Sequence, residues 1–216
     1  MPARADEGGI TTGNLLGVIL AGGGSRRFGR EKALFPLAGR PMAAWALEAL
    51  RQCTPDQVVI TTEPRIAETL KIRSRPDRIP GAGPLGGLHA ALSWAREEGR
   101  DGVFLLACDL PLVKGDLIHR ILGRWPSGAP AAVPGSPGPL GFEPLCAGYG
   151  TDVLEAAETL LQEGRRAMES LLEVLEVAPI PIEELGKADD LAVAFTNVNT
   201  EDVAEEVETS MDGKTR

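Results

Sequence analysis

Short runs of apolar residues, separated by amphipathic stretches, place the strongest constraint on how this 216-residue chain can fold. In "LLGVILA" (15–21) and "GVFLLAC" (102–108), nearly every position is apolar, so both faces of each run are apolar. A strand of this kind is buried on both faces, which is typical of a mostly parallel sheet covered by helices. We therefore expect an α/β protein with three α/β/α layers around a mostly parallel central sheet.

The other elements follow from apolar periodicity and from turn residues. The expected strands are residues 15–21, 57–62, 102–108, 130–134, 143–149 and 177–182. The expected helices are residues 41–53, 64–70, 86–98, 115–125, 151–162, 166–176 and 199–208. The Pro- and Gly-rich segment 129–149 has two interpretations, either loops with a hairpin or an inserted flap that shapes an acceptor pocket.

Length and composition bound the organisation of the chain. We expect one domain over residues 15–208, with flexible tails at 1–14 and 209–216. The net charge of −9 argues against binding to nucleic acid or to an anionic membrane surface. The chain has no apolar run near membrane-spanning length and no apolar core of a signal peptide, which predicts a cytoplasmic protein. Cys53, Cys108 and Cys146 form no CxxC pair, so we expect core thiols rather than a disulfide or zinc site.

One loop stands out chemically, within "VILAGGGSRRFGREKAL" (18–34). Consecutive glycines at 22–24 let backbone N–H groups approach phosphates, and Arg27 and Lys32 can add charge-assisted hydrogen bonds. A Walker A loop would need Lys and Ser/Thr where Arg30 and Glu31 stand, and a dinucleotide fingerprint would need glycine at Arg27. The remaining pattern, L-A-G-G-x-S-x-R-[F/M]-G-x-[D/E]-K, predicts a nucleoside triphosphate that is attacked at its α-phosphate. The alternative is a basic turn without a ligand.

A second charged position is expected beside this loop. Asp109 follows the strand at 102–108, as the glycines follow the strand at 15–21. Ligands of open parallel sheets bind beyond the carboxyl ends of the strands. The two segments therefore predict one site at one edge of the sheet.

Five segments, in order, resemble the MobA-type molybdenum cofactor guanylyltransferases, which are nucleotidyltransferases with a GT-A-like, Rossmann-like α/β fold. They are "LAGGGSRRFGREKAL" (20–34), "PDRIPGAGPLGGLHAAL" (76–92), "LLACDLPLV" (105–113), "EPLCAGY" (143–149) and "FTNVNTEDV" (195–203). The resemblance covers about residues 15–208, and the last segment is the more specific marker of the guanylyl group. It implies a nucleotide-binding half, 15–125, and an acceptor-binding half, 126–208.

The resemblance implies catalytic roles for three residues. Asp109 would bind Mg²⁺, an ion that takes few protein carboxylates together with phosphates and water. Arg27 and Lys32 would hold the triphosphate and stabilise the charge that develops in the transition state. A structural role for Asp109, as a helix N-cap or turn residue, is the alternative.

The resemblance also implies binding roles. Asp77 would lie near the guanine nucleotide, while Asn197 and Asn199 suit a phosphate or a pterin edge, although asparagine is also common in turns. The residues implied in binding are Leu20, Ala21, Gly22, Gly23, Lys32, Asp77, Asp109, Asn197 and Asn199.

The implied reaction transfers GMP from GTP to the terminal phosphate of molybdenum-loaded molybdopterin, which gives molybdopterin guanine dinucleotide and pyrophosphate. The implied partners are other proteins of molybdenum cofactor synthesis and the recipient molybdoenzymes. Thr61 and Thr62 stand where relatives often have Asn, and Glu143 stands where they often have Gln. Three different functions remain open at this point, namely a cytidylyltransferase, a sugar- or alcohol-phosphate nucleotidyltransferase, and a nucleotide-binding protein without catalysis.

Overall fold

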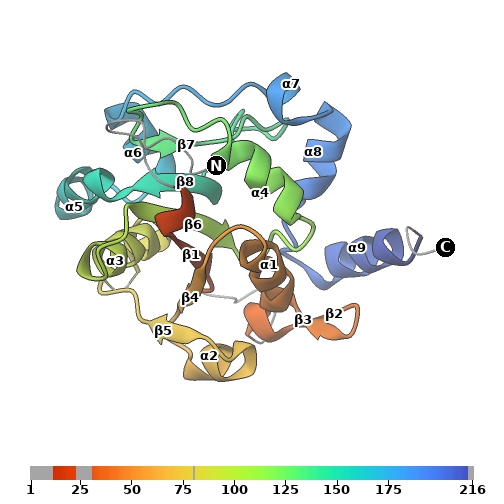
Figure 1. Ribbon diagram of the computed structural model, residues 1–216. Coiled ribbons are helices and arrows are strands. Elements are labelled where there is room, and N and C mark those ends of the chain that lie inside the picture. The colour runs from red at the N-terminus through yellow and green to blue at the C-terminus, as the bar shows by residue number, and fades with distance from the viewer. Residues whose placement is uncertain (1–11, 23–30, 80, 214–216) are drawn as a thin grey trace, which may run out of the picture.

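A mostly parallel sheet forms the centre of the computed structural model, which describes residues 12–22, 31–79 and 81–213 (Figure 1). Within these residues six strands pair in the order β5-β4-β1-β6-β8-β7. They are β1 (Leu15–Leu20), β4 (Asp56–Ile60), β5 (Arg73–Arg75), β6 (Gly102–Ala107), β7 (Ala131–Ala132) and β8 (Cys146–Gly150). The strands β5, β4, β1 and β6 are parallel, and β8 is antiparallel to both β6 and β7. The expected sheet is confirmed.

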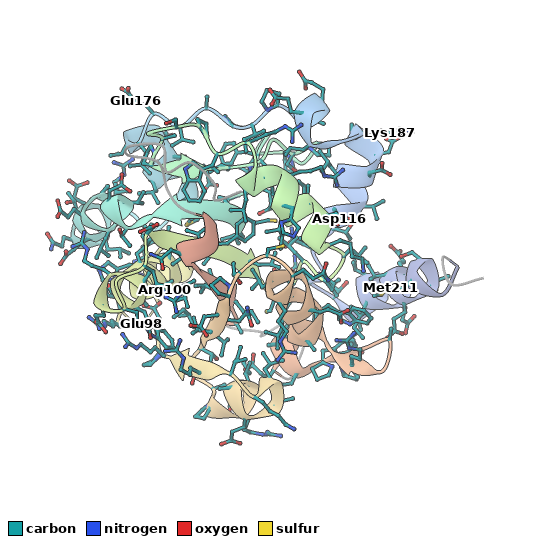
Figure 2. All side chains as sticks on the ribbon, viewed as in Figure 1. Glu98, Arg100, Asp116, Glu176, Lys187 and Met211 are labelled. Carbon is teal, nitrogen blue, oxygen red and sulfur yellow. The ribbon has the colours of Figure 1, made fainter. Side chains whose placement is uncertain are left out.

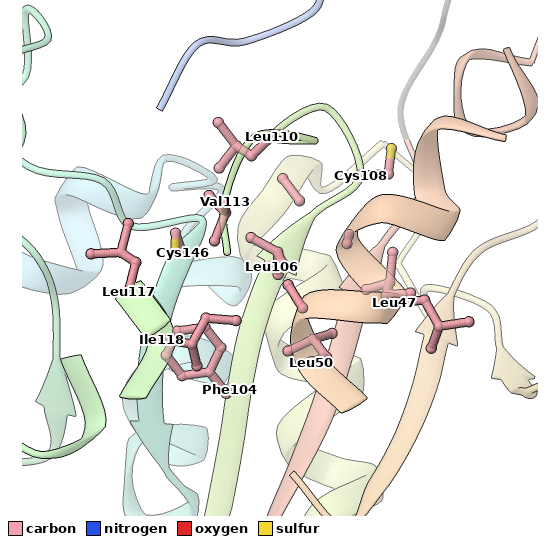
Figure 3. Packing of buried hydrophobic residues seen from close by; sticks show 14 of the residues in the cluster. Leu47, Leu50, Phe104, Leu106, Cys108, Leu110, Val113, Leu117, Ile118 and Cys146 are labelled. Atoms are coloured by element: carbon pink, nitrogen blue, oxygen red, sulfur yellow. The ribbon is translucent and has the colours of Figure 1, made fainter. Parts of the chain in front are cut away.

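Helices cover both faces of this sheet (Figure 1). One face carries α1 (Met42–Arg51), α2 (Pro64–Leu70), α4 (Gly115–Leu122), α7 (Ile182–Leu185) and α8 (Ala188–Ala194). The opposite face carries α3 (Gly83–Glu97), α5 (Leu154–Gln162) and α6 (Met168–Val174). Strand residues alternate between the two apolar clusters, as Phe104 and Leu106 pack towards α1 and α4 (Figure 3) while Val103 and Leu105 pack towards α3. Three layers result.

The C-terminal helix belongs to a third, smaller cluster. The short hairpin of β2 (Pro36–Leu37) and β3 (Arg40–Pro41) packs with α9 (Glu201–Gly213). The members of this cluster, which we call the C-terminal core, are Phe35, Leu37, Met42, Val198, Ala204 and Val207. The Glu208 carboxylate also accepts a hydrogen bond from the Ala38 backbone N–H. Helix α9 is thus fixed against the segment that follows Lys32.

The edge strand β5 is held by charged side chains. Arg73 and Arg75 form ion pairs with Glu98 and Glu97 at the end of α3, and both guanidinium groups lie over the Trp94 ring. Glu98 also lies near Arg100 (Figure 2), with 3.9 Å between their charged atoms. The Arg73 hydrogen bond lowers the pKa of Glu98, which keeps this carboxylate ionised. Because these pairs are largely exposed, they fix the position of β5 more than they add stability.

Most expected elements are confirmed, and the expected strand at 177–182 is wrong. Residues 177–182 form no strand, since Pro179 and Pro181 lack the N–H groups of a ladder and Ile180 makes an isolated bridge to Pro134. Residues 12–14 and 209–213, which fall within the expected tails, form a 3-10 helix and the end of α9, respectively. Segment 129–149 contains the antiparallel pair β7 and β8 with loops between them, as the hairpin interpretation predicts.

The cysteines lie where core thiols were expected. Cys108 and Cys146 are buried, Cys53 is half-buried, and all three are free. Burial raises the pKa of Cys108 to about 12, with the neighbouring Asp109 adding to the shift, so this thiol stays protonated.

The longest helix among the described residues, α3, has 15 residues. No helix in this part of the chain has both the length and the apolar character needed to cross a membrane.

Candidate active site

Three polar side chains from distant segments meet at the carboxyl edge of the sheet. The Lys32 ammonium donates one hydrogen bond to Asp109 Oδ2 and another to Asn199 Oδ1, each over 2.7 Å. The Lys32 and Asp109 side chains are 14% and 21% exposed, so the pair is partly shielded from water but reachable. We call these residues the Lys32 cluster.

Parallel pairing of β1 with β6 sets the position of this cluster. The two strands are in register up to Leu20 and Ala107, and Cys108 N–H extends the ladder with a 3.0 Å bond to the Leu20 carbonyl. The segments that leave the two strands therefore run side by side. The expectation of one shared edge is confirmed for the end of β1 and Asp109, while residues 23–30 lie outside the described part of the chain.

The segment "NVNT" joins the site through its backbone. Val198 N–H donates to the Asp109 carbonyl over 2.9 Å, and the Val198 side chain is fully buried in the C-terminal core. Asn197 and Asn199 flank it and are exposed. Because Val198 points into the core, Asn199 points away from it and accepts the hydrogen bond from Lys32. Asn199 is therefore more than a turn residue, since its side chain contacts the site.

Lys32 itself stands on a short, well-packed turn. It begins the 3-10 helix Lys32–Leu34, in which Ala33 is buried. Phe35 follows in the C-terminal core, and its carbonyl accepts a 2.9 Å bond from Met42 N–H. The lysine backbone is thus fixed while its side chain reaches the cluster.

Around β1, the described residues that were expected to bind nucleotide lie beside the cluster. Leu20 is half-buried, Ala21 is buried, and Ala21 N–H donates to the Ile60 carbonyl over 3.1 Å. Gly22 is exposed, and a Cβ added there would meet no atom within 4 Å. Its backbone is therefore open to a ligand. Gly23 and Arg27 lie outside the described residues.

Asp77 lies against the beginning of α3, apart from the Lys32 cluster. Its Oδ1 accepts a 2.9 Å bond from Ile79 N–H, and a Cβ on Gly86 would lie 2.7 Å from its Oδ2. A Cβ on Gly87 would lie 2.8 Å from Leu20 Cδ2. The two glycines thus let α3 approach both Asp77 and the end of β1.

Arg165 and Arg166 have partners within the fold. Arg165 lies 3.5 Å from a Glu173 carboxylate oxygen, whereas Arg166 donates a 2.8 Å bond to the Gly81 carbonyl, next to the beginning of α3. Arg166 therefore ties the segment between α5 and α6 to the segment that precedes α3.

Two further carboxylates, both within segments that carry the family resemblance, contribute to the electrostatics of this edge. Burial raises the pKa of Glu143 to about 7, the negative charge of Asp109 adds to this shift, and the Leu145 backbone N–H opposes it. Burial also raises the pKa of Glu31, with a further contribution from Glu63. Burial of a carboxylate depends on the tertiary fold, so the spacing of residues in the sequence does not predict that the pKa values of Glu31 and Glu143 are raised.

The side chains of this site could hold a metal ion only together with oxygen atoms of a bound substrate. In the described part of the chain, no group of three or more His, Cys, Asp and Glu side chains could hold a metal ion. Asp109 offers a single carboxylate, which already contacts the Lys32 ammonium. One carboxylate, a lysine and an exposed glycine backbone together suit a phosphate-rich anion that brings further oxygen ligands.

An open, mostly parallel sheet with a glycine-rich sequence after its first strand, a lysine 12 residues beyond that strand's last residue and an aspartate after the neighbouring strand is typical of a nucleotidyltransferase. The family model of the MobA-like NTP transferase domain matches residues 17–178. The chain belongs to this family and is an enzyme of the nucleotidyltransferase class.

Individual relatives agree with this assignment. The molybdenum cofactor guanylyltransferase of Desulfosudis oleivorans is 33% identical over 196 residues, which is 90% of this chain and 95% of the relative. A probable molybdenum cofactor guanylyltransferase of Opitutus terrae is 34% identical over 179 residues, or 79% of this chain and 86% of the relative. The crystal structure of molybdopterin-guanine dinucleotide biosynthesis protein A from Archaeoglobus fulgidus has a TM-score of 0.75 and 28% identity, and the match covers 92% of this chain and all of that one.

Proposed function

We propose that this enzyme transfers GMP from GTP to the terminal phosphate of molybdenum-loaded molybdopterin. The observation that carries the proposal is the Lys32 cluster, which unites the glycine-turn segment, the "CDLP" segment and the "NVNT" segment at one point. The names of the relatives point to the same reaction. The products are molybdopterin guanine dinucleotide and pyrophosphate.

Nucleotidyltransferases generally use a divalent metal ion, and we assign Mg²⁺ to Asp109. The residue fits because its carboxylate contacts the Lys32 ammonium at 2.7 Å, and because the preceding residue, Cys108, donates a backbone hydrogen bond to the Leu20 carbonyl at the end of β1. When bound, Mg²⁺ neutralises negative charge on the triphosphate oxygens. The protein supplies one carboxylate and the substrate supplies further oxygens, which is the usual way in which this ion is bound at phosphate sites.

Lys32 and Arg27 hold the triphosphate as its charge shifts towards the leaving pyrophosphate. Leu20, Ala21, Gly22 and Gly23 contact the nucleotide through their backbone, and Asp77 lies towards the guanine nucleotide. An oxygen of the acceptor phosphate forms a bond to the α-phosphorus while the bond from that phosphorus to the pyrophosphate oxygen breaks. A phosphate nucleophile is already ionised at neutral pH, so the reaction needs no general base.

The second half of the chain binds the acceptor. Asn197 and Asn199 lie at its junction with the nucleotide site, where amide groups suit phosphate or pterin atoms. We expect the product to pass to other proteins of molybdenum cofactor synthesis and to recipient molybdoenzymes.

One structural observation keeps CTP as a second candidate nucleotide. Thr61 is buried and its hydroxyl accepts a 3.1 Å bond from Glu63 N–H, so this hydroxyl is already engaged within the fold. Thr62 is exposed at the end of β4 and offers a shorter polar group than the asparagine frequent in relatives. Base choice at this position is therefore the part of the proposal that needs a direct test.

The test supplies purified protein with Mg²⁺, molybdenum-loaded molybdopterin and one of GTP, CTP, UTP or ATP, and measures pyrophosphate release and product mass. The proposal expects a guanine dinucleotide from GTP at a rate well above that with CTP, UTP or ATP. A cytosine dinucleotide would contradict it and indicate the cytidylyl reaction. Activity only with a sugar or alcohol phosphate as acceptor would overturn the proposal in favour of a nucleotidyltransferase for that acceptor. Binding without turnover would indicate a nucleotide-binding protein without catalysis.

A further inference from the structure

The ammonium group of Lys32 has two acceptors of different kinds. One is the charged Asp109 carboxylate and the other is the neutral Asn199 amide oxygen, both at 2.7 Å. A lysine ammonium has three N–H donors. Within the described residues two of them are therefore used, which leaves the third for a ligand.

A metal ion at Asp109 changes the balance between these two acceptors. Lys32 contacts the carboxylate that the proposed function assigns to Mg²⁺. Two cations in contact with one carboxylate oxygen repel each other strongly at a partly shielded site. Metal binding therefore weakens the bond of Lys32 to Asp109, whereas the uncharged Asn199 oxygen remains available to the ammonium.

The segment that carries Asn199 is well placed to act as a fixed support. Val198 binds the Asp109 carbonyl through its backbone N–H and buries its side chain in the C-terminal core. Phe35, three residues after Lys32, belongs to the same core. Both ends of the bond between Lys32 and Asn199 are thus attached to one packed unit.

We propose that Asn199 is a positioning residue, which keeps the Lys32 ammonium beside the triphosphate when the metal ion takes over Asp109. The long lysine side chain would otherwise gain rotamer freedom on losing its ion pair, and its bonds to phosphate would have to offset that entropy. This inference rests on the proposed function because it takes the ligand to be a metal-bound nucleoside triphosphate. It gives Asn199 an effect on nucleotide binding that acts through Lys32, without direct contact to the nucleotide.

The experiment is a double-mutant cycle on nucleotide affinity, with Asn199→Ala and Lys32→Met as the single variants. GTP binding is measured by calorimetry with Mg²⁺ and without acceptor, so no turnover is involved. We expect Asn199→Ala to weaken GTP binding about tenfold in the wild-type background and less than twofold in the Lys32→Met background, because its action requires the lysine. Equal weakening in both backgrounds would show direct contact with the nucleotide and overturn the inference, and so would unchanged affinity in the single variant.

A second readout uses Mn²⁺ without nucleotide, followed by electron paramagnetic resonance. Lys32→Met removes the cation that competes for Asp109, so we expect about tenfold tighter Mn²⁺ binding. Asn199→Ala leaves Asp109 as the remaining acceptor of Lys32 among the described residues, so the ammonium competes more strongly for this carboxylate, and we expect both Mn²⁺ and GTP to bind more weakly, Mn²⁺ by about twofold. Because a loss of structure would also weaken Mn²⁺ binding, Asn199→Ala is measured in the Lys32→Met background as well, where we expect no further change. An equal loss of Mn²⁺ affinity in both backgrounds, or tighter Mn²⁺ binding by Asn199→Ala, would contradict the inference.

Thr200→Ala is the matched control. The Thr200 hydroxyl accepts a 3.3 Å bond from Val203 N–H at the beginning of α9 and makes no bond to Lys32. This variant loosens the same segment, and we expect its affinities for GTP and Mn²⁺ to stay within twofold of wild type. If Thr200→Ala reproduced the effects of Asn199→Ala, general loosening of the segment would explain them and the inference would fail.

Thermal unfolding confirms that each variant is folded, and Asn199→Ser replaces Asn199→Ala if the latter does not fold. If the wild type binds CTP and not GTP, the proposed function fails and the same cycle is run with CTP. The cycle then still decides whether Asn199 acts through Lys32.

Discussion

At the scale of single residues, Asp109 is the position on which the proposed chemistry depends most. Asp109→Asn keeps the shape of the side chain and its capacity to accept from Lys32 but removes the negative charge that a metal ion requires. We expect nucleotidyl transfer to fall at least about 1000-fold with little change in the free energy of unfolding. Steady-state kinetics and urea denaturation measure the two quantities.

The control for Asp109→Asn is Asp116→Asn, the same change at an exposed position in the first turn of α4 (Figure 2). We expect its activity to remain within twofold of wild type. Near-normal turnover of Asp109→Asn would remove this carboxylate from the mechanism.

Glu143 makes the stability of the protein depend on pH in an identifiable direction. Its pKa is about 7 in the folded protein and 4.5 in the reference state, so the folded protein binds the additional proton between these values. The folded state with a protonated Glu143 therefore has its full stability below pH 4.5, and this contribution to the free energy of unfolding is lost as the pH rises through about 7. We expect Glu143→Gln, which stays neutral, to be more stable than wild type at pH 8, by up to about 3 kcal/mol.

Urea denaturation at pH 5 and pH 8 tests this prediction, because the difference between variant and wild type cancels the titration of other groups. Glu173→Gln, an exposed position on α6, serves as the control and is expected to show no such pH-dependent difference. A gain in stability that is equal at both pH values would show that the ionisation of Glu143 is not its cause.

Lys32 and Asp109 could be predicted from the sequence because each follows an apolar run within a compact motif. Asn199 could be predicted as a site residue from its segment, but its bond to Lys32 could not, since 167 residues separate the two. The burial of Glu143 depends on how the second half of the chain folds over Asp109, and no local pattern reports that. Sequence thus reveals chemistry that is concentrated in one segment, whereas contacts between segments require the structure.

At the scale of elements, the beginning of α3 depends on close packing. Glycine inside a helix normally costs stability relative to alanine. At Gly86 the sign is reversed, because an added Cβ would lie 2.4 Å from the Ala82 Cβ and 2.7 Å from Asp77 Oδ2. We expect Gly86→Ala to lower the free energy of unfolding by about 1–3 kcal/mol and to weaken GTP binding by displacing Asp77.

Chemical denaturation and nucleotide calorimetry measure the two effects of Gly86→Ala. Ser93→Ala, a change to a better helix former at a half-buried position of the same helix, is the control and is expected to change stability by less than about 0.5 kcal/mol. A Gly86→Ala variant as stable as wild type would show that α3 can shift away from Asp77 at no cost.

Helices and strands could be predicted from the sequence where their own side chains form an apolar face that becomes buried. The strands β1 and β6 and the helices α1 and α3 meet this condition. By contrast, β5 consists of the residues "RSR", which are held by ion pairs and by stacking on Trp94, so no apolar pattern marks it. Residues 177–182 show the opposite case, in which an apolar run with two prolines cannot form a ladder.

At the scale of the whole molecule, strand order determines where the site lies. The chain runs from β1 outward to β4 and β5 on one side and then crosses to β6 on the other side. The connections therefore diverge between β1 and β6, and open α/β sheets bind ligands at such a point. Lys32 and Asp109 lie at this point, and the C-terminal segment closes it through Val198.

This arrangement predicts that packing far from the nucleotide affects nucleotide binding. Val207 on α9 is 4% exposed in the C-terminal core, which also contains Phe35 and Val198. We expect Val207→Ala to lower the free energy of unfolding by about 1–3 kcal/mol. We further expect the KM for GTP to rise by about two- to fivefold with kcat less affected, because the support shared by Lys32 and Asn199 becomes looser.

The matched control is Val193→Ala on α8, where the same side chain is 43% exposed and its removal leaves no cavity. We expect this variant to remain within about 0.5 kcal/mol of wild type, with unchanged kinetics. Denaturation combined with steady-state kinetics distinguishes the outcomes. If Val207→Ala lost stability and kept the wild-type KM, the C-terminal core would only stabilise the fold, and the lysine would be held in place by the sheet edge alone.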